Sequence, residues 1–381
     1  MTAVAACVGD SGEKAKKTAE NGLYSSVPTG QVVVELDSIS SSESNALQYL
    51  KYGDTRNLIY YDSKSGNINF IDLDQKRISH KIYLAEEGPD AITHFLGLAV
   101  KNTDTIFVFD KSYKIFQINY QGHVIRNFDY GAMDIVNPIA SLSLYQANAI
   151  FEGNRIYLLQ TSGQNHYLDE HNPTNFKFCT VLDIRSGEFK PLNICHPATY
   201  WEDGIKPLYV SWCRGDDYFV FSPIYSHDLY LSRDCNQIDS IITLKSKYVN
   251  DFVYYNPNKV PSASAYFGDL IEKEYYLGIL YDPYRKVYYR FFWPGMSIES
   301  FDSDDIFKTA VLLPTFGISV FDENFQLIDE IILPKNRYRA HQCFVAEEVL
   351  YLSANHPGNP DLKENEWRFD IFTLQKNNNA E

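Results

Sequence analysis

Concentrated positive charge is what this sequence most clearly lacks. Lys and Arg number 34 against 49 Asp and Glu, which gives a formal net charge of −15 over 381 residues. The one short basic stretch is EKAKK at residues 13–17. Nucleic acids and anionic lipid surfaces are both bound through clusters of Lys and Arg. We therefore expect no nucleic-acid partner and no direct attachment of the folded body to a membrane.

Long apolar runs and the common catalytic signatures are missing as well. No stretch of about 18 apolar residues occurs, so the sequence predicts no transmembrane helix. The GxSxG, HExxH, Walker A and GxGxxG patterns are all absent. The densest group of potential metal ligands is HYLDEH at His166–His171, in an irregular segment without fixed geometry, and DSDD at Asp302–Asp305 lacks the Gly and Glu of a calcium loop. We expect no metal site and no cofactor.

The six cysteines form no CxxC pair, which excludes zinc ribbons and thioredoxin-like redox motifs. Most of those in the body of the chain stand among strand-forming residues, where a free Cys behaves as a small buried hydrophobe. We expect this role for them, with room for one disulfide in an oxidising compartment.

Aromatic residues, in contrast, are abundant: 15% of the chain, with 29 Tyr and 24 Phe, which favours strands. Two neighbouring stretches align almost residue for residue, one starting at Arg56 and the other at Asp104. In each, an aromatic strand ends in Asp (Asp62 and Asp110), and a short turn, a second strand, a polar turn and a third strand follow. An all-strand repeat of this period predicts a β-propeller.

Six such units can be recognised, and the last is one strand short. The segment QVVVELD at residues 31–37 is a strand without a unit of its own. Pairing it with the last unit would leave no bare edge at either end. We predict an all-β, six-bladed β-propeller of four-stranded blades, closed by this N-terminal strand. A seven-bladed count stays open if residues 250–271 or 295–315 contain further strands.

The predicted domains are a truncated signal, lipobox and flexible tether over residues 1–30, one propeller domain over 31–376, and a disordered tail over 377–381. Val4-Ala5-Ala6-Cys7 resembles a bacterial lipobox, in which the chain is cut before the Cys and the Cys carries the lipid. The polar stretch after Cys7 has too few large apolar groups to fold, which suits a tether.

The long connections of a propeller built this way should open on one face, because blade-to-blade connections and the loops between second and third strands share a side. Insertions on one face of a repeat array usually mark the binding face. The candidate ligand-binding residues at this face are Asp90, His94, Trp201, Glu202, Asp203, Asp269, Arg337, Arg339 and His341.

Three features together resemble a known family: the lipobox-like start, YDPYRKVYYRFF at Tyr281–Phe292, and the ending LSANHPGNPD…RFDIFTL between Leu352 and Leu374. The chain looks like the TolB-like six-bladed propeller lipoproteins of unassigned function that are common in Bacteroidota. The resemblance implies an extracytoplasmic propeller of a Gram-negative envelope, anchored through Cys7, and it brings no catalytic residues.

We hypothesise a lipid-anchored binding module for a protein, peptide or glycan, acting as a monomer or within an envelope complex. The alternative is a propeller hydrolase or lyase, lactonase-like or glycan-active, with carboxylates at the channel mouth and calcium as its conceivable metal. Its acid and base groups would come from Glu202, Asp203, Asp269, Arg339 and His341. A third hypothesis is a purely structural scaffold, and whether the chain is an enzyme stays open.

Overall fold

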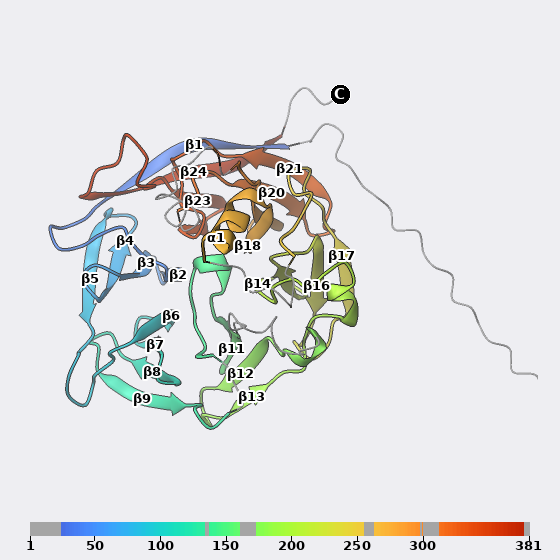
Figure 1. The fold of residues 1–381 in the computed structure, drawn as a ribbon. Coiled ribbons are helices and arrows are strands. Elements are labelled where there is room, and N and C mark those ends of the chain that lie inside the picture. Colours follow the sequence, from blue (N-terminus) through green and yellow to red (C-terminus); the bar gives the residue numbers. More distant parts are fainter. Residues whose placement is uncertain are drawn as a thin grey trace, which may run out of the picture.

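Short antiparallel strands make up nearly all of the regular structure in this computed structural model, which describes residues 24–133, 137–160, 173–254, 263–297, 299 and 312–376. The sheets follow one another around a ring when the molecule is seen along its axis (Figure 1). In the described residues no helix is long and apolar enough to cross a membrane.

Four sheets contain four strands each, ordered as they occur in the chain. The first of these is β6 (Phe95–Asn102), β7 (Thr105–Asp110), β8 (Lys114–Ile118) and β9 (Val124–Asp129). The second is β10 (Ile150–Glu152), β11 (Arg155–Leu159), β12 (Cys179–Asp183) and β13 (Phe189–Pro191). The third is β14 (Val210–Arg214), β15 (Phe219–Pro223), β16 (Asp228–Ser232) and β17 (Ser240–Thr243). The fourth is β18 (Tyr275–Asp282), β19 (Val287–Trp293), β20 (Gly317–Asp322) and β21 (Leu327–Ile332).

The remaining strands form one eight-stranded sheet, in the order β2-β3-β4-β5-β1-β24-β23-β22. Its first part is β2 (Leu47–Tyr52), β3 (Thr55–Asp62), β4 (Asn67–Asp72) and β5 (Arg77–Tyr83). Its second part is β1 (Tyr24–Glu35), β24 (Glu366–Lys376), β23 (Val349–Ser353) and β22 (Cys343–Ala346).

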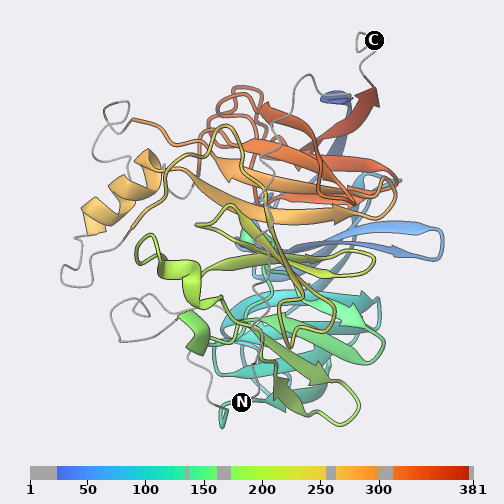
Figure 2. The same ribbon diagram turned by 90° about the vertical axis from the view of Figure 1, so that its right-hand side faces the viewer.

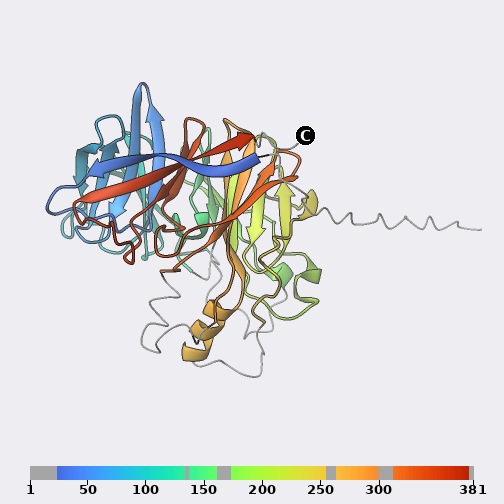
Figure 3. The ribbon, with the colours of Figure 1, turned by 90° about the horizontal axis from the view of Figure 1, so that it is seen from above.

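The first strand of the chain pairs with the last, as the sequence predicts. β1 runs antiparallel to β24, with Val32 opposite Phe369 and Val34 opposite Trp367 (Figure 3). β1 is longer than the predicted strand, because it begins at Tyr24 rather than at Gln31. Pairing of this kind satisfies the backbone groups of both terminal strands, so neither presents a bare edge to its neighbour.

Apolar side chains gather between neighbouring sheets. Ile59 and Ile68 of β3 and β4 pack in one cluster with Val108 and Ile118 of β7 and β8, and all four are buried. A strand that is buried on both faces carries apolar residues at nearly every position. β19, with the sequence VYYRFFW, is such a strand and is buried along its whole length. The core is therefore a ring of interfaces between sheets.

Side chains also link the sheets near the centre of the ring. Gln48 of β2 donates to the carbonyl of Val100 at 2.7 Å and accepts from the same residue's N–H at 2.8 Å. Ser141 approaches β6 so closely that a Cβ on Gly97 would lie 2.4 Å from the backbone of Ser141. Only glycine fits there.

The long connections open on one side of the ring. The blade-to-blade connections that include η3 (Ala198–Trp201) and α1 (Ala263–Glu272) project from the same side (Figure 2). We call this side the long-loop face. The turns between first and second strands, such as 53–54, 103–104 and 347–348, lie at the other ends of their strands and are short.

Two parts of the chain differ from the predicted strands. α1 is a helix within the stretch where extra strands could have raised the blade count, so the described part of residues 250–271 adds none. The stretch from Ser141 also differs from a regular strand, because it holds the 3-10 turn η1 (Leu144–Gln146) before the short β10. The tertiary contacts of Gln146, which is buried and donates to Cys343 Sγ, hold η1 near the centre.

Candidate functional site

An open cleft of about 470 Å³ lies on the long-loop face, above the sheet β14–β17. It is lined by the connection that carries η3, by the turn between β15 and β16, which we call the floor, and by Phe252. The lining residues are Pro197, Thr199, Tyr200, Glu202, Asp203, Lys206, Ser226, His227, Asp228, Tyr230, Thr243 and Phe252. Two of the predicted candidates, Glu202 and Asp203, are therefore neighbours in one cleft.

Lys206 is the buried cation of this cleft. Its side chain is only 6% exposed, and its Nζ lies 2.8 Å from Oδ1 of Asp203. The ammonium also lies over the ring of Tyr200, 4.8 Å from the centroid, and 5.8 Å from the ring of Tyr254. Aromatic faces attract a cation, so both rings and the carboxylate offset the loss of water around Lys206.

Tyr254 ties the two connections of the cleft together. Its hydroxyl donates to Oδ2 of Asp203 at 3.0 Å, across 51 positions of the sequence. Burial first, and then the neighbouring carboxylate of Asp203, raise the pKa of Tyr254 to about 12. The phenol therefore stays protonated near neutral pH and keeps its role as a donor.

A second buried cation holds the floor. Arg290 of β19 is fully buried and donates from Nη2 to the carbonyl of Ser226 at 2.7 Å and from Nη1 to the carbonyls of His227 and Leu244 at 3.1 and 3.0 Å. Its Nε donates to Ser222 Oγ at 3.0 Å. Burial lowers the pKa of Arg290 to about 10, which leaves it charged at neutral pH. The guanidinium thus fixes the turn that forms the floor.

The imidazole of His227 is held neutral. Burial, followed by the positive charges of Arg290, Lys245 and Lys206, lowers the pKa of His227 to about 3. Its Nδ1 lies 2.9 Å from the hydroxyl of Tyr276. At neutral pH this ring therefore adds no charge to the cleft.

The cleft offers a ligand mainly carboxylate oxygens, which are hydrogen-bond acceptors. Oδ1 of Asp228 accepts from the hydroxyl of Thr243 at 2.5 Å, no described residue donates to its Oδ2, and Glu202 is exposed. Three carboxylates and one ammonium line the cleft. The site therefore suits a ligand that brings several donors, such as sugar hydroxyls or the polar groups of a peptide.

A second, smaller cavity of about 20 Å³ also lies on the long-loop face. It brings together two other predicted candidates, Arg339 and His341, with His356 from the loop between β23 and β24. Its other lining residues are Leu312, Leu313, Tyr338 and Ala340. Burial, followed by the charge of Arg339, lowers the pKa of His341 to about 4.

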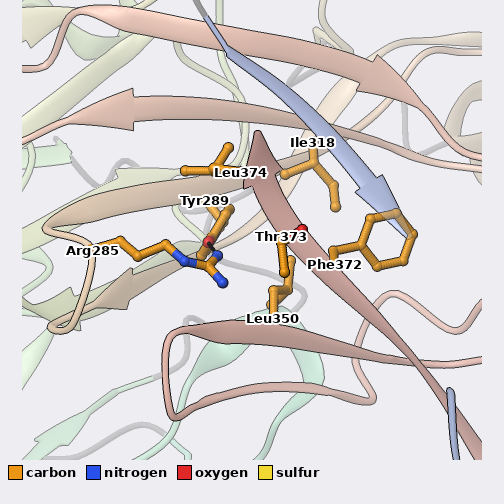
Figure 4. Close-up of a pocket in the computed structure, with 7 residues that line it drawn as sticks. All are labelled: Arg285, Tyr289, Ile318, Leu350, Phe372, Thr373 and Leu374. Atoms are coloured by element: carbon orange, nitrogen blue, oxygen red, sulfur yellow. Dashed lines mark hydrogen bonds between the residues drawn. The ribbon is translucent and has the colours of Figure 1, made fainter. Parts of the chain in front are cut away.

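A third cavity lies between the sheet β18–β21 and strands β23 and β24 (Figure 4). Its volume is about 10 Å³, close to that of one water molecule, and the labelled lining includes Thr373, whose hydroxyl is buried without a partner. Arg285 donates from Nη1 to the hydroxyl of Tyr289 at 2.9 Å. The volume leaves room for one water molecule and not for a ligand.

The other predicted residues stand apart from these cavities. Trp201 donates its indole N–H to the carbonyl of Lys206 at 2.8 Å and does not itself line the cleft. Arg337 pairs with Asp370, with Nη2 and Nε 2.7 and 2.9 Å from Oδ2. That pairing fixes the connection between β21 and β22, which carries Arg337, to β24, which carries Asp370.

Asp90, His94 and Asp269 also line none of the three cavities. Asp90 accepts from the N–H of Val124 at 2.9 Å, and this bond, together with His123, lowers its pKa. The ring of His94 bonds the hydroxyl of Thr93, 2.8 Å away. Asp269 lies on α1, where burial and the nearby Glu272 raise its pKa.

Among the residues that the structure describes, no three His, Cys, Asp or Glu side chains are grouped so that they could hold a metal ion. Cys7, the HYLDEH segment and the DSDD segment lie outside the described residues. Cys179, Cys195, Cys213, Cys235 and Cys343 are free thiols.

Sequence reasoning missed Lys206, His227, Asp228 and Arg290. Lys206 looks like any surface lysine in WEDGIKP, because its burial depends on Tyr254, which lies far along the chain. Arg290 stands in a strand among aromatic residues. An arginine inside an otherwise apolar strand is the one signal that could have been noticed, since a charged residue is rarely buried without partners.

Fold and cavities together define an all-β, propeller-like protein that carries an open cleft on the face of its long connections. Residues 23–332 match the model of the family described as "Domain of unknown function (DUF4221)". The chain belongs to this family. The expected membership of a family of unassigned function is thereby confirmed.

Solved structures show the same fold. A DUF4221 member from Bacteroides vulgatus superposes with a TM-score of 0.80 at 22% identity, covering 94% of this chain and 100% of that one. A Bacteroides fragilis protein described as a "Putative exported protein" gives a TM-score of 0.53 at 10% identity, covering 91% of this chain and 95% of the other. No curated protein matches the sequence.

Proposed function

We propose that this DUF4221 protein is an extracytoplasmic six-bladed propeller that binds a protein, peptide or glycan in the cleft beside η3. The single observation that carries the proposal is the cleft itself. It combines a volume of about 470 Å³, two buried cations that fix its walls and floor, and carboxylates left open to a ligand. Rigid walls lower the conformational cost of binding, which favours a binding site over a passive surface.

The way in which the eight-stranded sheet is joined supports the proposed count of six blades. β1 and β5 share a single parallel pair, Glu35 opposite Arg77, whereas β1 and β24 are paired along nearly their whole lengths. Dividing the sheet at that single pair yields two four-stranded blades, β2–β5 and β22–β24 with β1. Together with the other four sheets, this division supports a ring of six blades.

The location and anchor belong to the same proposal. The lipobox-like stretch before Cys7 supports export and lipid attachment, and a relative with a TM-score of 0.53 carries a description as exported. Several acyl chains on one cysteine hold a protein firmly to a membrane. A binding face on a tethered propeller would be free to meet ligands outside the cytoplasm.

The hydrolase or lyase alternative needs its five groups near one substrate. Glu202 and Asp203 line the cleft, Arg339 and His341 line the small cavity, and Asp269 lines neither. This separation gives the combined mechanism no geometric support, so the binding function is the one we propose.

A thermal-shift screen tests the binding function. Peptides, oligosaccharides and divalent metal salts are added to the full chain, and a compound that binds the folded state raises the melting temperature by mass action. We expect a hit among peptides or oligosaccharides. Its stabilisation should fall sharply in Asp228→Asn, because one carboxylate of the cleft is then replaced by an amide of the same shape.

The matched control is Asp217→Asn, which changes an exposed carboxylate in the turn between β14 and β15 of the same sheet. It should leave the stabilisation by the hit unchanged. Equal losses in Asp228→Asn and Asp217→Asn would mean that the ligand does not use the cleft.

A further inference from the structure

We propose that Arg339 and His341 form a second binding site, one that accepts a carboxylate group of a ligand. The site is the cavity of about 20 Å³ at the entrance to β22, and no residue lines both it and the cleft beside η3. This site is separate from the cleft, because its residues, its charge and its size differ from those of the cleft.

Arg339 is a nearly buried guanidinium without a close carboxylate among the described residues. Its side chain is 10% exposed, and its Nε donates to the carbonyl of Asn355 at 3.0 Å. The nearest carboxylate oxygen, Oε1 of Glu43, lies 3.8 Å from Nη2 and belongs to a side chain that is 65% exposed. The Nη groups of Arg339 therefore keep most of their donor capacity.

Arg337, two positions earlier, provides the comparison. It has its own carboxylate, Asp370, at 2.7 Å. Within the described residues, the same short connection thus carries one arginine with a close carboxylate partner and one whose nearest carboxylate oxygen is 3.8 Å away. A guanidinium presents paired N–H donors that match the two oxygens of a carboxylate, so an outside carboxylate can do for Arg339 what Asp370 does for Arg337.

His341 supplies a second donor. None of the residues that the structure describes hydrogen-bonds to its ring, although the ring is partly buried and lines the cavity. Burial and the charge of Arg339 lower the pKa of His341, so the ring is neutral near pH 7 and keeps one N–H to donate. A polar ring left unbonded at the edge of a cavity points to a missing partner.

The rest of the cavity limits what fits. His356 is already used, because its Nε2 lies 2.6 Å from the carbonyl of Leu312 and its Nδ1 accepts from the N–H of Gly358 at 3.0 Å. Leu313 and Ala340 contribute apolar surface. A volume of about 20 Å³ holds one or two atoms the size of water, which suits the two oxygens of a carboxylate better than the four of a phosphate.

Nuclear magnetic resonance of the histidine rings tests the site in the full chain. The His341 ring signal is assigned by comparison with His341→Gln, and sodium acetate replaces sodium chloride at constant ionic strength. We expect the His341 signal to shift and saturate, while the signal of His94, exposed elsewhere, stays in place. Glucuronate and an N-acetylated aspartate amide then show whether a sugar acid or an acidic side chain binds more tightly.

Arg339→Gln should weaken acetate binding by about tenfold or more, since a charge-assisted pair of hydrogen bonds is lost. Arg77→Gln, which removes an exposed arginine of β5, should leave it unchanged. The acetate titration of the wild-type protein tests the site by itself, even if neither variant folds. An unshifted His341 signal, or a shift that chloride or phosphate reproduces as well as acetate does, would overturn the carboxylate assignment. These results leave the cleft untested, so the two proposals fail separately.

Discussion

At the scale of single residues, buried aspartates at the ends of strands account for the repeat seen in the sequence. Asp62 accepts from the N–H and the hydroxyl of Ser41 and from the N–H of Lys64. Asp110 accepts from the N–H groups of His94 and Ser112. Each carboxylate accepts from the turn that follows it and from the connection that precedes its blade, so the recurring Asp has a structural role.

The change Asp110→Ala should lower the free energy of unfolding by about 1–3 kcal/mol, because two backbone N–H groups lose the buried carboxylate that accepts from them. The measurement is a urea titration followed by tryptophan fluorescence. Asp104→Ala, at an exposed position in the turn between β6 and β7, should cost less than about 0.5 kcal/mol. Equal effects at the two positions would refute the structural role.

Arg290 is the residue on which the floor of the cleft depends. The change Arg290→Lys keeps a charge but replaces a planar fork by a point charge that cannot reach the same set of carbonyls. We expect it to lower the free energy of unfolding by about 2 kcal/mol or more, since buried carbonyls lose charge-assisted bonds.

Ligand binding separates this effect from general damage. Folded Arg290→Lys protein should bind the screening hit more weakly, because the turn 224–227 loses its support. A variant that is destabilised yet binds with unchanged affinity would show that the floor does not shape the cleft.

Histidines whose pKa is lowered by burial make stability depend on pH, and His196 and His227 show the largest shifts. Burial lowers the pKa of His196 and of His227 to about 3, from an ordinary value of 6.5. As pH falls below 6.5, these histidines bind protons in the unfolded chain but stay neutral in the folded chain, so unfolding becomes more favourable. Each such group removes about 1.4 kcal/mol per pH unit between pH 6.5 and its folded pKa.

The free energy of unfolding, measured from pH 7 to pH 4.5, should therefore decrease as the solution becomes more acidic. His196→Gln should make the slope shallower by the share of one histidine, and His94→Gln, an exposed control, should leave it unchanged. A slope that is the same in wild type and His196→Gln would contradict the assignment of His196 as a buried neutral ring.

At the scale of elements, β1 belongs to the folded body. Val34 of β1 is fully buried and packs in one cluster with Tyr60, Trp367 and Phe369. The change Val34→Ala should cost about 2 kcal/mol of unfolding free energy, through lost apolar contacts and the cavity left behind. Glu35→Ala, the exposed neighbour, should be nearly neutral. If both were neutral in thermal unfolding, β1 would be a tether instead of a closing strand.

The strands could be predicted from the sequence, whereas α1 could not. Short apolar and aromatic segments between turn residues indicate strands directly, and the missing strand of the last unit indicates how the ring closes. α1 is held by tertiary contacts instead: the indole N–H of Trp293 donates to the carbonyl of Ile271 at 3.0 Å, as does the N–H of Met296 at 2.8 Å. Nothing local in the sequence shows those partners.

The candidate site shows the same division. Glu202 and Asp203 could be predicted because they lie in a long connection on the expected face. Lys206 could not be placed with them, since its burial needs Tyr200 and Tyr254 from two different connections. The six-residue HYLDEH segment and Cys7 lie outside the described residues, so the hypotheses about them stay predictions.

At the scale of the whole molecule, the proposed lipid anchor at Cys7 would hold the proposed binding face close to a membrane. If Cys7 carries lipid, cells fed labelled palmitate should yield labelled protein from the wild-type gene and unlabelled protein from Cys7→Ser. The reason is that the lipid is attached to the sulfur and amine of this residue alone. Label that persists in Cys7→Ser would remove the anchor from the account and leave the cleft unaffected.

The central claim is that a ligand is bound on the long-loop face beside η3. Hydrogen–deuterium exchange with and without the hit from the thermal-shift screen tests it most directly. We predict slower exchange in peptides that cover residues 197–206 and 224–228, with the turns 215–218 and 283–286 on the opposite face unchanged. Protection confined to those opposite turns, with none around η3, would contradict the account.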